Sequence, residues 1–400
     1  MAVVGAASAL IVDVLLGYPL LLRWLANLHN NPVCKDAQLR LVSVVLPVHN
    51  GERFLQRKLK SLLSLNYPRE LMEIMVLSDG SEDHTYEIAR SFASEGVRFM
   101  RIARSGKAAA INAAVPEVGG EILVLTDVRQ SLEPDCLRNA IGCFGDPKVG
   151  AVSANVFVSC GESRAEYDNG MYYRYELWMR KQMARIDSSF GCTGSFYALR
   201  RFLWTAIPAN ILLDDVYRPL TAFFKGYRLV LEPTAIVHDF STTLDSEFGR
   251  KLRTQAGLYQ LLQVMPELFS SGNRMRLHFL SAKYGRTIIP YCLILIAMAT
   301  LGLPAPSRTV VAAGQASFYA LAALDILLPS HFPLRRLTSP LRTFVVLMAA
   351  SLLGAKVFFT PPRSLCKETK VCDRVGEVRE GASDIGLAQS SIANSQGDRP

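Results

Sequence analysis

Apolar residues gather near both ends of the chain and leave a mixed region between them. Val3–Leu25 is almost continuously apolar and is about as long as the ~20 residues that a membrane-spanning helix needs. Three more apolar stretches follow late in the sequence, at Thr287–Leu303, Thr309–Leu328 and Leu341–Phe359. The pattern predicts an N-terminal transmembrane helix over residues 1–26 and about three transmembrane helices over residues 287–359.

The flanks of these stretches indicate their orientation. A cleaved signal peptide is the alternative for the first stretch, which Asp13 and Pro19 interrupt, but no basic segment precedes it and no clear small-residue cleavage site follows it. Basic residues precede the second and fourth stretches, at Lys251, Arg253, Arg274, Arg276, Lys283, Arg286, Arg335, Arg336 and Arg342. By the positive-inside rule, we expect a multi-pass protein of the cell (inner or plasma) membrane whose middle region is cytoplasmic.

Short β-branched and apolar runs in the middle region alternate with helical patterns. The runs are Leu41–Pro47, Ile74–Leu77 and Ile122–Leu125. Such alternation is typical of a parallel α/β sheet, in which ligands bind beyond the carboxyl ends of the strands. Asp79 and Asp127 follow two of these strands at that position. An Asp that caps the next turn is the alternative for each.

Composition and charge narrow the function classes. Half of the residues are hydrophobic and the mean hydropathy is positive, which fits a chain that is part enzyme and part membrane anchor. The net charge is +9, but no nucleic-acid fold signature accompanies it. The eight cysteines are scattered without metal or redox spacing, which favours a reducing compartment. Residues 361–400, rich in Ser, Gly, Gln and charge, are predicted to be disordered.

Five short motifs occur in the middle region, and their order and spacing are informative. They are "VVLPVHNGERFL", "GKAAAINAAV", "ILVLTD", "TGSFYALRR" and "LLDDV". Their order and spacing resemble those of membrane-bound, inverting family-two glycosyltransferases, the group that includes cellulose, chitin and hyaluronan synthases and many exopolysaccharide transferases. The resemblance implies a Rossmann-like, nucleotide-sugar-binding domain of the GT-A type over residues 41–266, with a nucleotide half (41–150) and an acceptor half (151–266).

The resemblance also implies roles for residues within the first motifs. It places Pro47, His49 and Glu52 at the nucleotide pocket and gives Asp79 a contact with the uracil or its ribose. Lys107 would lie near the diphosphate, because a lysine in a flexible loop can reach a phosphate as a point charge. On the residues alone, a solvated surface lysine is the alternative.

The metal motif of the family is incomplete in this chain. Asp127 matches the first acid of an Asp-x-Asp motif, but the third position is Arg129. A hard divalent cation needs oxygen ligands, usually one or two carboxylates plus phosphates and waters. We expect Mg²⁺ or Mn²⁺ to be held weakly through Asp127 alone, or Arg129 to supply positive charge to the phosphates in its place.

Two adjacent acids, Asp214 and Asp215, resemble the catalytic pair of the family. Inverting transfer needs one base that removes a proton from the attacking acceptor hydroxyl, and we assign that base to Asp215. Mutual repulsion within such a pair tends to raise one pKa, which suits a base. A helix N-cap followed by a first-turn acid is the alternative reading of the pair.

The remaining motifs concern the acceptor. The loop around "FGCTGSF" resembles the acceptor-side loop of the family, with Gly191, Thr193, Gly194 and Ser195 as its contacts and Cys192 as a space-filler. Arg250 and Arg253 lie where processive members carry a Gln-x-x-Arg-Trp motif, and are expected to neutralise the diphosphate. That motif, with its Trp, is absent, which argues against processive polymerisation; a basic helix at the membrane surface is the alternative.

Together these features predict an integral-membrane glycosyltransferase. It would move sugar from a nucleotide-sugar donor, a UDP-sugar by the resemblance, to a saccharide or lipid-linked acceptor in extracellular or envelope polysaccharide synthesis, with export-complex subunits as further partners. The alternative is a non-catalytic relative that binds sugar nucleotides within a polysaccharide assembly complex. The helical stretch Tyr167–Arg185 is predicted to lie at the lipid interface or against the sheet.

Overall fold

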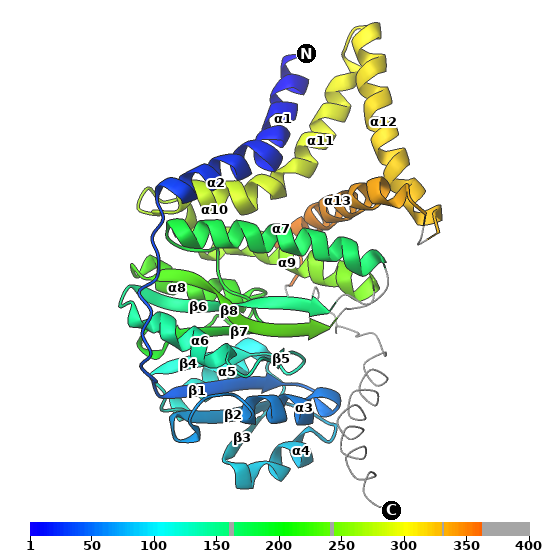
Figure 1. The fold of residues 1–400 in the computed structure, drawn as a ribbon. Coiled ribbons are helices and arrows are strands. Elements are labelled where there is room, and N and C mark those ends of the chain that lie inside the picture. The colour runs from blue at the N-terminus through cyan, green and yellow to red at the C-terminus, as the bar shows by residue number, and fades with distance from the viewer. Residues whose placement is uncertain (160–163, 241–243, 330–331, 362–400) are drawn as a thin grey trace, which may run out of the picture.

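The computed structural model describes residues 1–159, 164–240, 244–329 and 332–361. It shows an α/β domain below a group of long apolar helices (Figure 1), which confirms the predicted fold class. Apart from Pro361, the tail that was predicted to be disordered lies outside the described residues.

One mixed sheet runs through the whole α/β domain. Its eight strands follow the order β3-β2-β1-β4-β7-β6-β8-β5. Strands β1 to β4 are parallel, as predicted, whereas β7 is antiparallel to both of its neighbours. The nucleotide and acceptor halves therefore share a single sheet. The strands are β1 (Val42–Val48), β2 (Met72–Asp79), β3 (Val97–Ile102), β4 (Ile122–Thr126), β5 (Ser131–Leu132), β6 (Val149–Ser159), β7 (Phe196–Arg200) and β8 (Arg228–Phe240).

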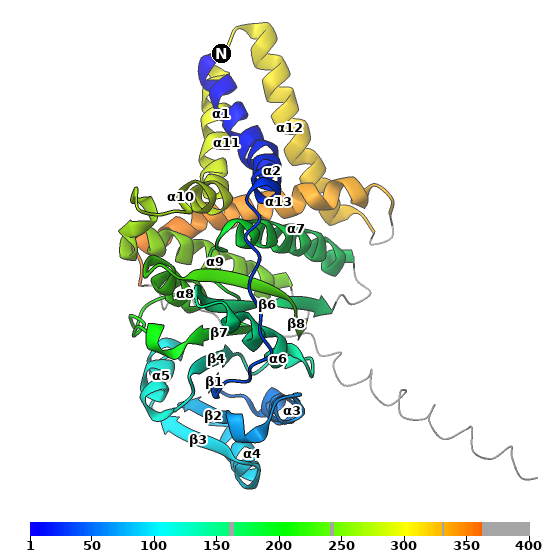
Figure 2. The same cartoon turned by 60° about the vertical axis from the view of Figure 1, so that its left-hand side comes forward.

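Helices cover both faces of the sheet and bury its apolar side chains. In β1, Val44 and Leu46 join one core cluster and Val45 joins the other, because successive side chains of a strand point to opposite faces. The helices are α3 (Glu52–Leu63), α4 (Thr85–Ser91), α5 (Lys107–Ala114), α6 (Cys136–Gly142), α7 (Arg164–Ile186), α8 (Asp214–Phe224) and α9 (Leu244–Val264). Helices α7 and α9 lie between the sheet and the apolar helices (Figure 2).

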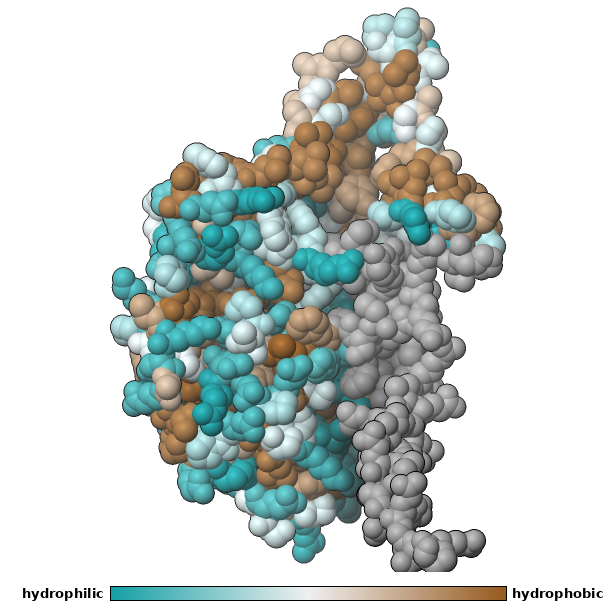
Figure 3. All heavy atoms as spheres, in the orientation of Figure 1, coloured by the Kyte–Doolittle hydropathy of each residue, from teal (hydrophilic) through white to brown (hydrophobic). Residues whose placement is uncertain are grey.

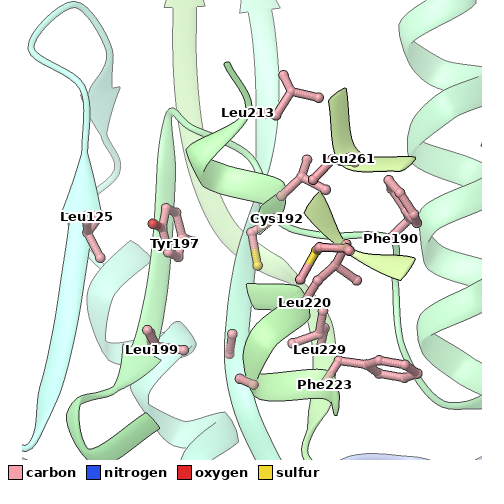
Figure 4. Packing of buried hydrophobic residues seen from close by; sticks show 14 of the residues in the cluster. Leu125, Phe190, Cys192, Tyr197, Leu199, Leu213, Leu220, Phe223, Leu229 and Leu261 are labelled. Atoms are coloured by element: carbon pink, nitrogen blue, oxygen red, sulfur yellow. The ribbon is translucent and has the colours of Figure 1, made fainter. Parts of the chain in front are cut away.

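The core beneath the start of α8 is tightly packed. Phe190, Cys192, Leu220 and Leu229 lie close together there (Figure 4), and each is almost completely buried. Burial raises the pKa of the Cys192 thiol, so this side chain is neutral and acts as the predicted space-filler.

Four helical segments of the described chain are long and apolar enough to cross a membrane, which matches the predicted number. Apolar residues cover them, whereas polar residues dominate the domain below (Figure 3). Two segments are interrupted, the first by a π-helical turn at Asp13–Gly17 and the second by one at Leu280–Gly285. The component helices are α1 (Ala2–Val12), α2 (Tyr18–Leu28), α10 (Arg276–Phe279), α11 (Arg286–Leu301), α12 (Ala305–Leu327) and α13 (Arg335–Gly354).

Helix α13 differs from a simple span. Arg335, at its start, bonds to Asp325 near the end of α12 with N–O distances of 3.2 Å. Val357, just after its end, packs against Leu212 and Tyr259 of the α/β domain. Both views show α13 lying across the top of that domain (Figures 1 and 2). Its two ends are therefore on the same side of the molecule.

Candidate active site

A cavity of about 500 Å³ opens at the carboxyl ends of β1 and β2. It lies where the parallel half of such a sheet is expected to bind a ligand. Its wall includes five of the donor-site residues expected from the sequence and one of the paired acids: Pro47, His49, Asp79, Lys107, Arg253 and Asp214. Helix α5 begins at Lys107 and α8 begins at Asp214, so two helix N-termini border the cavity.

Asp79 holds the loop that leads into α5. Its carboxylate accepts hydrogen bonds from the backbone N–H of Ser105 at 2.7 Å and of Gly106 at 3.0 Å, and pairs with Arg104 at 2.6 Å. Gly106 has a φ of +93°, which a residue with a side chain rarely adopts. Asp79 lines the cavity, and its carboxylate positions this loop. Its expected contact with a base or ribose stays a prediction.

Lys107 joins two of the predicted acids. Its Nζ lies 2.9 Å from Asp127 Oδ1 and 3.5 Å from Asp214 Oδ2. Burial opposes the charge on Lys107, but Asp127, Asp214 and Asp215 outweigh it and raise the pKa of the ammonium group. The lysine is therefore a positive charge of the cavity wall, held between carboxylates although its side chain is 38% exposed.

A glycine separates the carboxylates of Asp127 and Asp215. A Cβ atom built on Gly194 would lie 3.3 Å from Asp215 Oδ2 and 3.6 Å from Asp127 Oδ2. The two carboxylates therefore face the same small space, which stays open because residue 194 has no side chain. The structure thus brings acids from β4 and α8 together with Lys107.

The two adjacent acids have opposite pKa shifts. For Asp214, burial favours the neutral form, but Lys107, Arg218 and Arg253 outweigh it and lower the pKa. For Asp215, burial and the neighbouring Asp214 charge raise the pKa. Two acids whose pKa values are pushed apart can divide an ionic role and a proton-accepting role between them.

Arg218 forms an ion pair with Asp214, and it was not predicted as a site residue from the sequence. Its Nη2 lies 3.9 Å from Asp214 Oδ2, its guanidinium stacks 4.3 Å from the centre of the Trp204 ring, and Nη1 donates to the Tyr197 hydroxyl. The side chain is fully buried. The i, i+4 spacing from Asp214 within a helix was the available signal.

The N-cap reading of the acid pair does not apply. The N-cap of α8 is Leu213, which makes no side-chain capping bond, and both acids lie in the first turn of the helix.

The predicted acceptor loop lies beside these acids. Gly191 has a φ of +73°, and a Cβ atom there would lie 2.8 Å from Val216 Cα. The backbone N–H of Cys192 donates to the Asp215 carbonyl at 2.9 Å, that of Thr193 donates to Ser153 Oγ at 3.1 Å, and the Ser195 carbonyl accepts from Thr126 Oγ1 at 2.7 Å. These bonds tie the loop to α8, β6 and β4.

Four predicted donor-site residues are absent from the cavity wall. One is Asp127, which pairs with Lys107 of that wall. Arg129 forms two 2.9 Å hydrogen bonds with Asp239 of β8, so its charge is used there and not on donor phosphates. Glu52 is exposed and pairs with His84 at 3.0 Å. Arg250 lies on α9 outside the cavity wall, whereas Arg253, one turn further along, contributes to it.

A buried lysine beneath β4 was also missed. Lys58 Nζ donates to Thr126 Oγ1 at 2.7 Å and to the Gln130 carbonyl at 2.9 Å. Burial lowers the pKa of Lys58 to about 7. It lies among apolar positions of the amphipathic helix α3. The sequence therefore indicated that Lys58 is buried, but it did not indicate which residues Lys58 contacts.

The described residues offer a divalent cation few ligands. They contain no group of three or more His, Cys, Asp or Glu side chains that would hold a metal ion. Asp127 supplies one carboxylate, and Lys107 already pairs with its Oδ1. Mg²⁺ is often bound through only one or two carboxylates plus substrate phosphates and waters. The site therefore fits a cation that Asp127 and the donor diphosphate hold jointly.

Comparisons with known proteins agree with this geometry. The structure is similar to that of the mannosyltransferase PcManGT from Pyrobaculum calidifontis, solved in complex with GDP-Man and Mn²⁺. The similarity covers 88% of the present chain and 99% of PcManGT, with a TM-score of 0.68 and 23% sequence identity. The fold is therefore that of a GT-A glycosyltransferase. Residues 43–205 match the family model described as Glycosyl transferase family 2, and the chain contains a domain of that family.

Two curated relatives are about 30% identical over part of the chain. The β-monoglucosyldiacylglycerol synthase of Nostoc sp. is 31% identical over 38% of this chain and 31% of its own. The poly-β-1,6-N-acetyl-D-glucosamine synthase of Staphylococcus epidermidis is 32% identical over 30% of this chain and 29% of its own. The matched segment thus spans less than a third of either relative.

Proposed function

We propose that this protein is an inverting, membrane-bound glycosyltransferase. It takes a sugar from a nucleotide-sugar donor, a UDP-sugar in our proposal, and passes it to a saccharide or lipid-linked acceptor in envelope or extracellular polysaccharide synthesis. The observation that carries the proposal is Lys107, which joins Asp127 and Asp214 next to Asp215 and Gly194. The names of the two curated relatives, a glycolipid synthase and a polysaccharide synthase, support both acceptor classes.

The donor occupies the 500 Å³ cavity in this proposal. Lys107, Arg104 and Arg253 line it and neutralise the diphosphate of the leaving nucleotide. The loop held by Asp79 fixes the first two of these cations in place. A divalent cation bound through Asp127 would add charge neutralisation at the diphosphate.

Asp215 acts as the base. Its carboxylate removes the proton of the acceptor hydroxyl, whose oxygen forms a bond to the anomeric carbon as the bond to the diphosphate oxygen breaks. The nucleotide diphosphate leaves with that electron pair from the opposite face, so the configuration inverts. Asp214 remains ionised beside Lys107 and Arg218, and its charge favours proton uptake by Asp215.

The membrane placement belongs to the same proposal. We place the protein in the inner or plasma membrane, with the catalytic domain on the cytoplasmic side. The four long apolar segments support the membrane location, and the basic residues that flank them support the orientation. Export-complex subunits remain proposed partners.

Turnover by the full-length protein tests the proposal. Protein in nanodiscs is given a panel of UDP- and GDP-sugars with saccharide and lipid acceptors, and release of nucleoside diphosphate is measured. We expect turnover with a UDP-sugar, and Asp215→Asn should lower kcat by about 10²–10⁴-fold, the usual contribution of a general base. Asp135→Asn, an exposed acid outside the cavity, is the matched control. Nucleotide binding without turnover would identify a non-catalytic relative instead.

A further inference from the structure

A second cavity, of about 450 Å³, lies between the catalytic domain and the apolar helices. Helices α7 and α9 form its floor, and α11 and α13 form its opposite wall. The wall on the membrane side is apolar and includes Ile289, Phe344 and Leu347. In both ribbon views, α13 passes over α7 and α9 at this level (Figures 1 and 2). The cavity therefore lies at the boundary between the α/β domain and the membrane helices.

This cavity reaches the acceptor side of the active site. Thr193 contributes to its wall. The next residue is Gly194, beside which the carboxylates of Asp215 and Asp127 lie. A molecule that fills the second cavity would therefore end next to the proposed base.

The charged residues that line the cavity are mostly basic. Glu176 accepts hydrogen bonds from Lys283 Nζ at 2.8 Å and from Arg286 Nη1. Burial opposes ionisation of Glu176, but Arg286 and Lys283 hold its pKa well below its usual range. Arg180 adds a third cation to the same wall. One carboxylate thus faces three cations within this group.

Arg180 supplies the observation that points to a ligand. Its Nη1 is buried and has no hydrogen-bond partner among the residues that the structure describes. A buried donor without a partner is costly, and a charged one more so. Arg180 is also close enough to Asp215 to affect its ionisation. An anionic group between Arg180 and Arg286 would satisfy this donor and would face a mostly basic wall.

We propose that the second cavity binds a lipid acceptor with an anionic phosphate between its chains and its accepting hydroxyl. The chains lie along Ile289, Phe344 and Leu347, and the phosphate lies at Arg180. A hydroxyl beyond the phosphate then reaches Asp215, where transfer proceeds as described above. This inference rests on the proposed function and specifies its acceptor.

Lipid binding tests the inference without requiring turnover. The full chain in detergent is titrated with phosphatidylinositol, which carries hydroxyls beyond a phosphate, with neutral diacylglycerol, and with inositol phosphate as a headgroup without chains. We expect phosphatidylinositol to bind most tightly. Arg180→Gln should weaken its binding about tenfold or more, as expected when a charge-assisted hydrogen bond is lost. Arg180→Lys should recover part of that loss.

Two further variants control for folding and for cavity shape. Arg174→Gln removes an exposed arginine from the same helix and should leave lipid binding unchanged. Leu347→Trp keeps every charge but fills the apolar end, and should also weaken phosphatidylinositol binding. Nucleotide affinity should persist in all of these variants, because none of the three residues lines the donor cavity.

Several results would overturn the inference. Equal affinity for diacylglycerol would show that the phosphate is not recognised, and equal affinity for inositol phosphate would show that the lipid chains are not. Unchanged binding in Arg180→Gln would remove its basis. If the wild-type protein bound the lipid selectively but neither bound nor turned over a nucleotide sugar, the proposed function would be contradicted instead.

Discussion

At the scale of single residues, the acid pair shows how position decides chemistry. Asp214 and Asp215 are neighbours in one helical turn. Of the two, only Asp214 forms ion pairs with Lys107 and Arg218. The ionised Asp214 then raises the pKa of Asp215, in addition to the effect of burial. Adjacent residues thereby acquire different protonation behaviour at the same pH.

This difference predicts the pH dependence of transfer. A base must be deprotonated, so activity is lost as pH falls through the pKa of Asp215, which lies above the ordinary value of about 3.9 for Asp. Lys107→Met removes a cation that favours ionised Asp215, and should move the acid limb of kcat/KM to higher pH. Asp135→Asn should leave the limb in place; an unchanged limb in Lys107→Met would contradict the assignment of the base.

Gly194 gives a second prediction at this scale. In Gly194→Ala, the new methyl group would lie 3.3 Å from Asp215 Oδ2, so one of the carboxylates must shift. Small displacements of reacting groups are costly, and we expect kcat to fall by roughly tenfold or more with little change in thermal stability. Gly119→Ala, where a Cβ meets nothing within 4 Å, is the matched control. Equal activity of the two variants would show that the space beside Gly194 is not used.

At the scale of elements, β8 and the segment after β4 are joined by one buried ion pair. Arg129 donates two hydrogen bonds to the Asp239 carboxylate, and the two side chains are only 15% and 6% exposed. Removing one partner of such a pair leaves a buried charge poorly compensated, which costs about 3–5 kcal/mol. Arg129→Met should therefore lower the free energy of unfolding by about 3 kcal/mol or less, given the residual exposure of the pair and because Asp239 has a further interaction.

Thermal unfolding of the protein in detergent measures this effect. The double variant Arg129→Met/Asp239→Leu should recover most of the loss, because both charges are then replaced by apolar groups. If Arg129 contacted donor phosphates instead, Arg129→Met would raise the donor KM and leave stability unchanged.

The Arg129–Asp239 pair illustrates which contacts can be predicted from the sequence and which cannot. Strands β1, β2 and β4 are apolar runs that end in turn residues, so local pattern was sufficient to predict them. Strands β6, β7 and β8 were not predicted, because the antiparallel position of β7 between β4 and β6 depends on contacts between distant segments. The partner of Arg129 is 110 residues away, and no local spacing indicated it. The acids at the site were found through resemblance, since the local pattern equally allowed caps.

At the scale of the whole molecule, the packing of α13 predicts the membrane topology. Hydropathy alone favoured a span here, but Val357 packs on the catalytic domain and Arg335 pairs with the end of α12. An apolar helix whose two ends lie on one side fits the membrane surface, where its apolar face meets lipid and also covers the second cavity. We therefore expect the segment after α13 to be on the same side of the membrane as the catalytic domain.

Cysteine labelling in sealed vesicles distinguishes the two topologies. In a background with Cys34, Cys160, Cys366 and Cys372 replaced by serine, Thr360→Cys should react with a membrane-impermeant maleimide only from the side of the catalytic domain, because Thr360 follows α13. Arg308→Cys, exposed in the first turns of α12, should react only from the opposite side, since α11 and α12 form a hairpin that projects away from the domain (Figure 1). Labelling of both positions from one side would contradict this arrangement, and would also remove α13 as the roof of a cavity that admits an acceptor from the membrane.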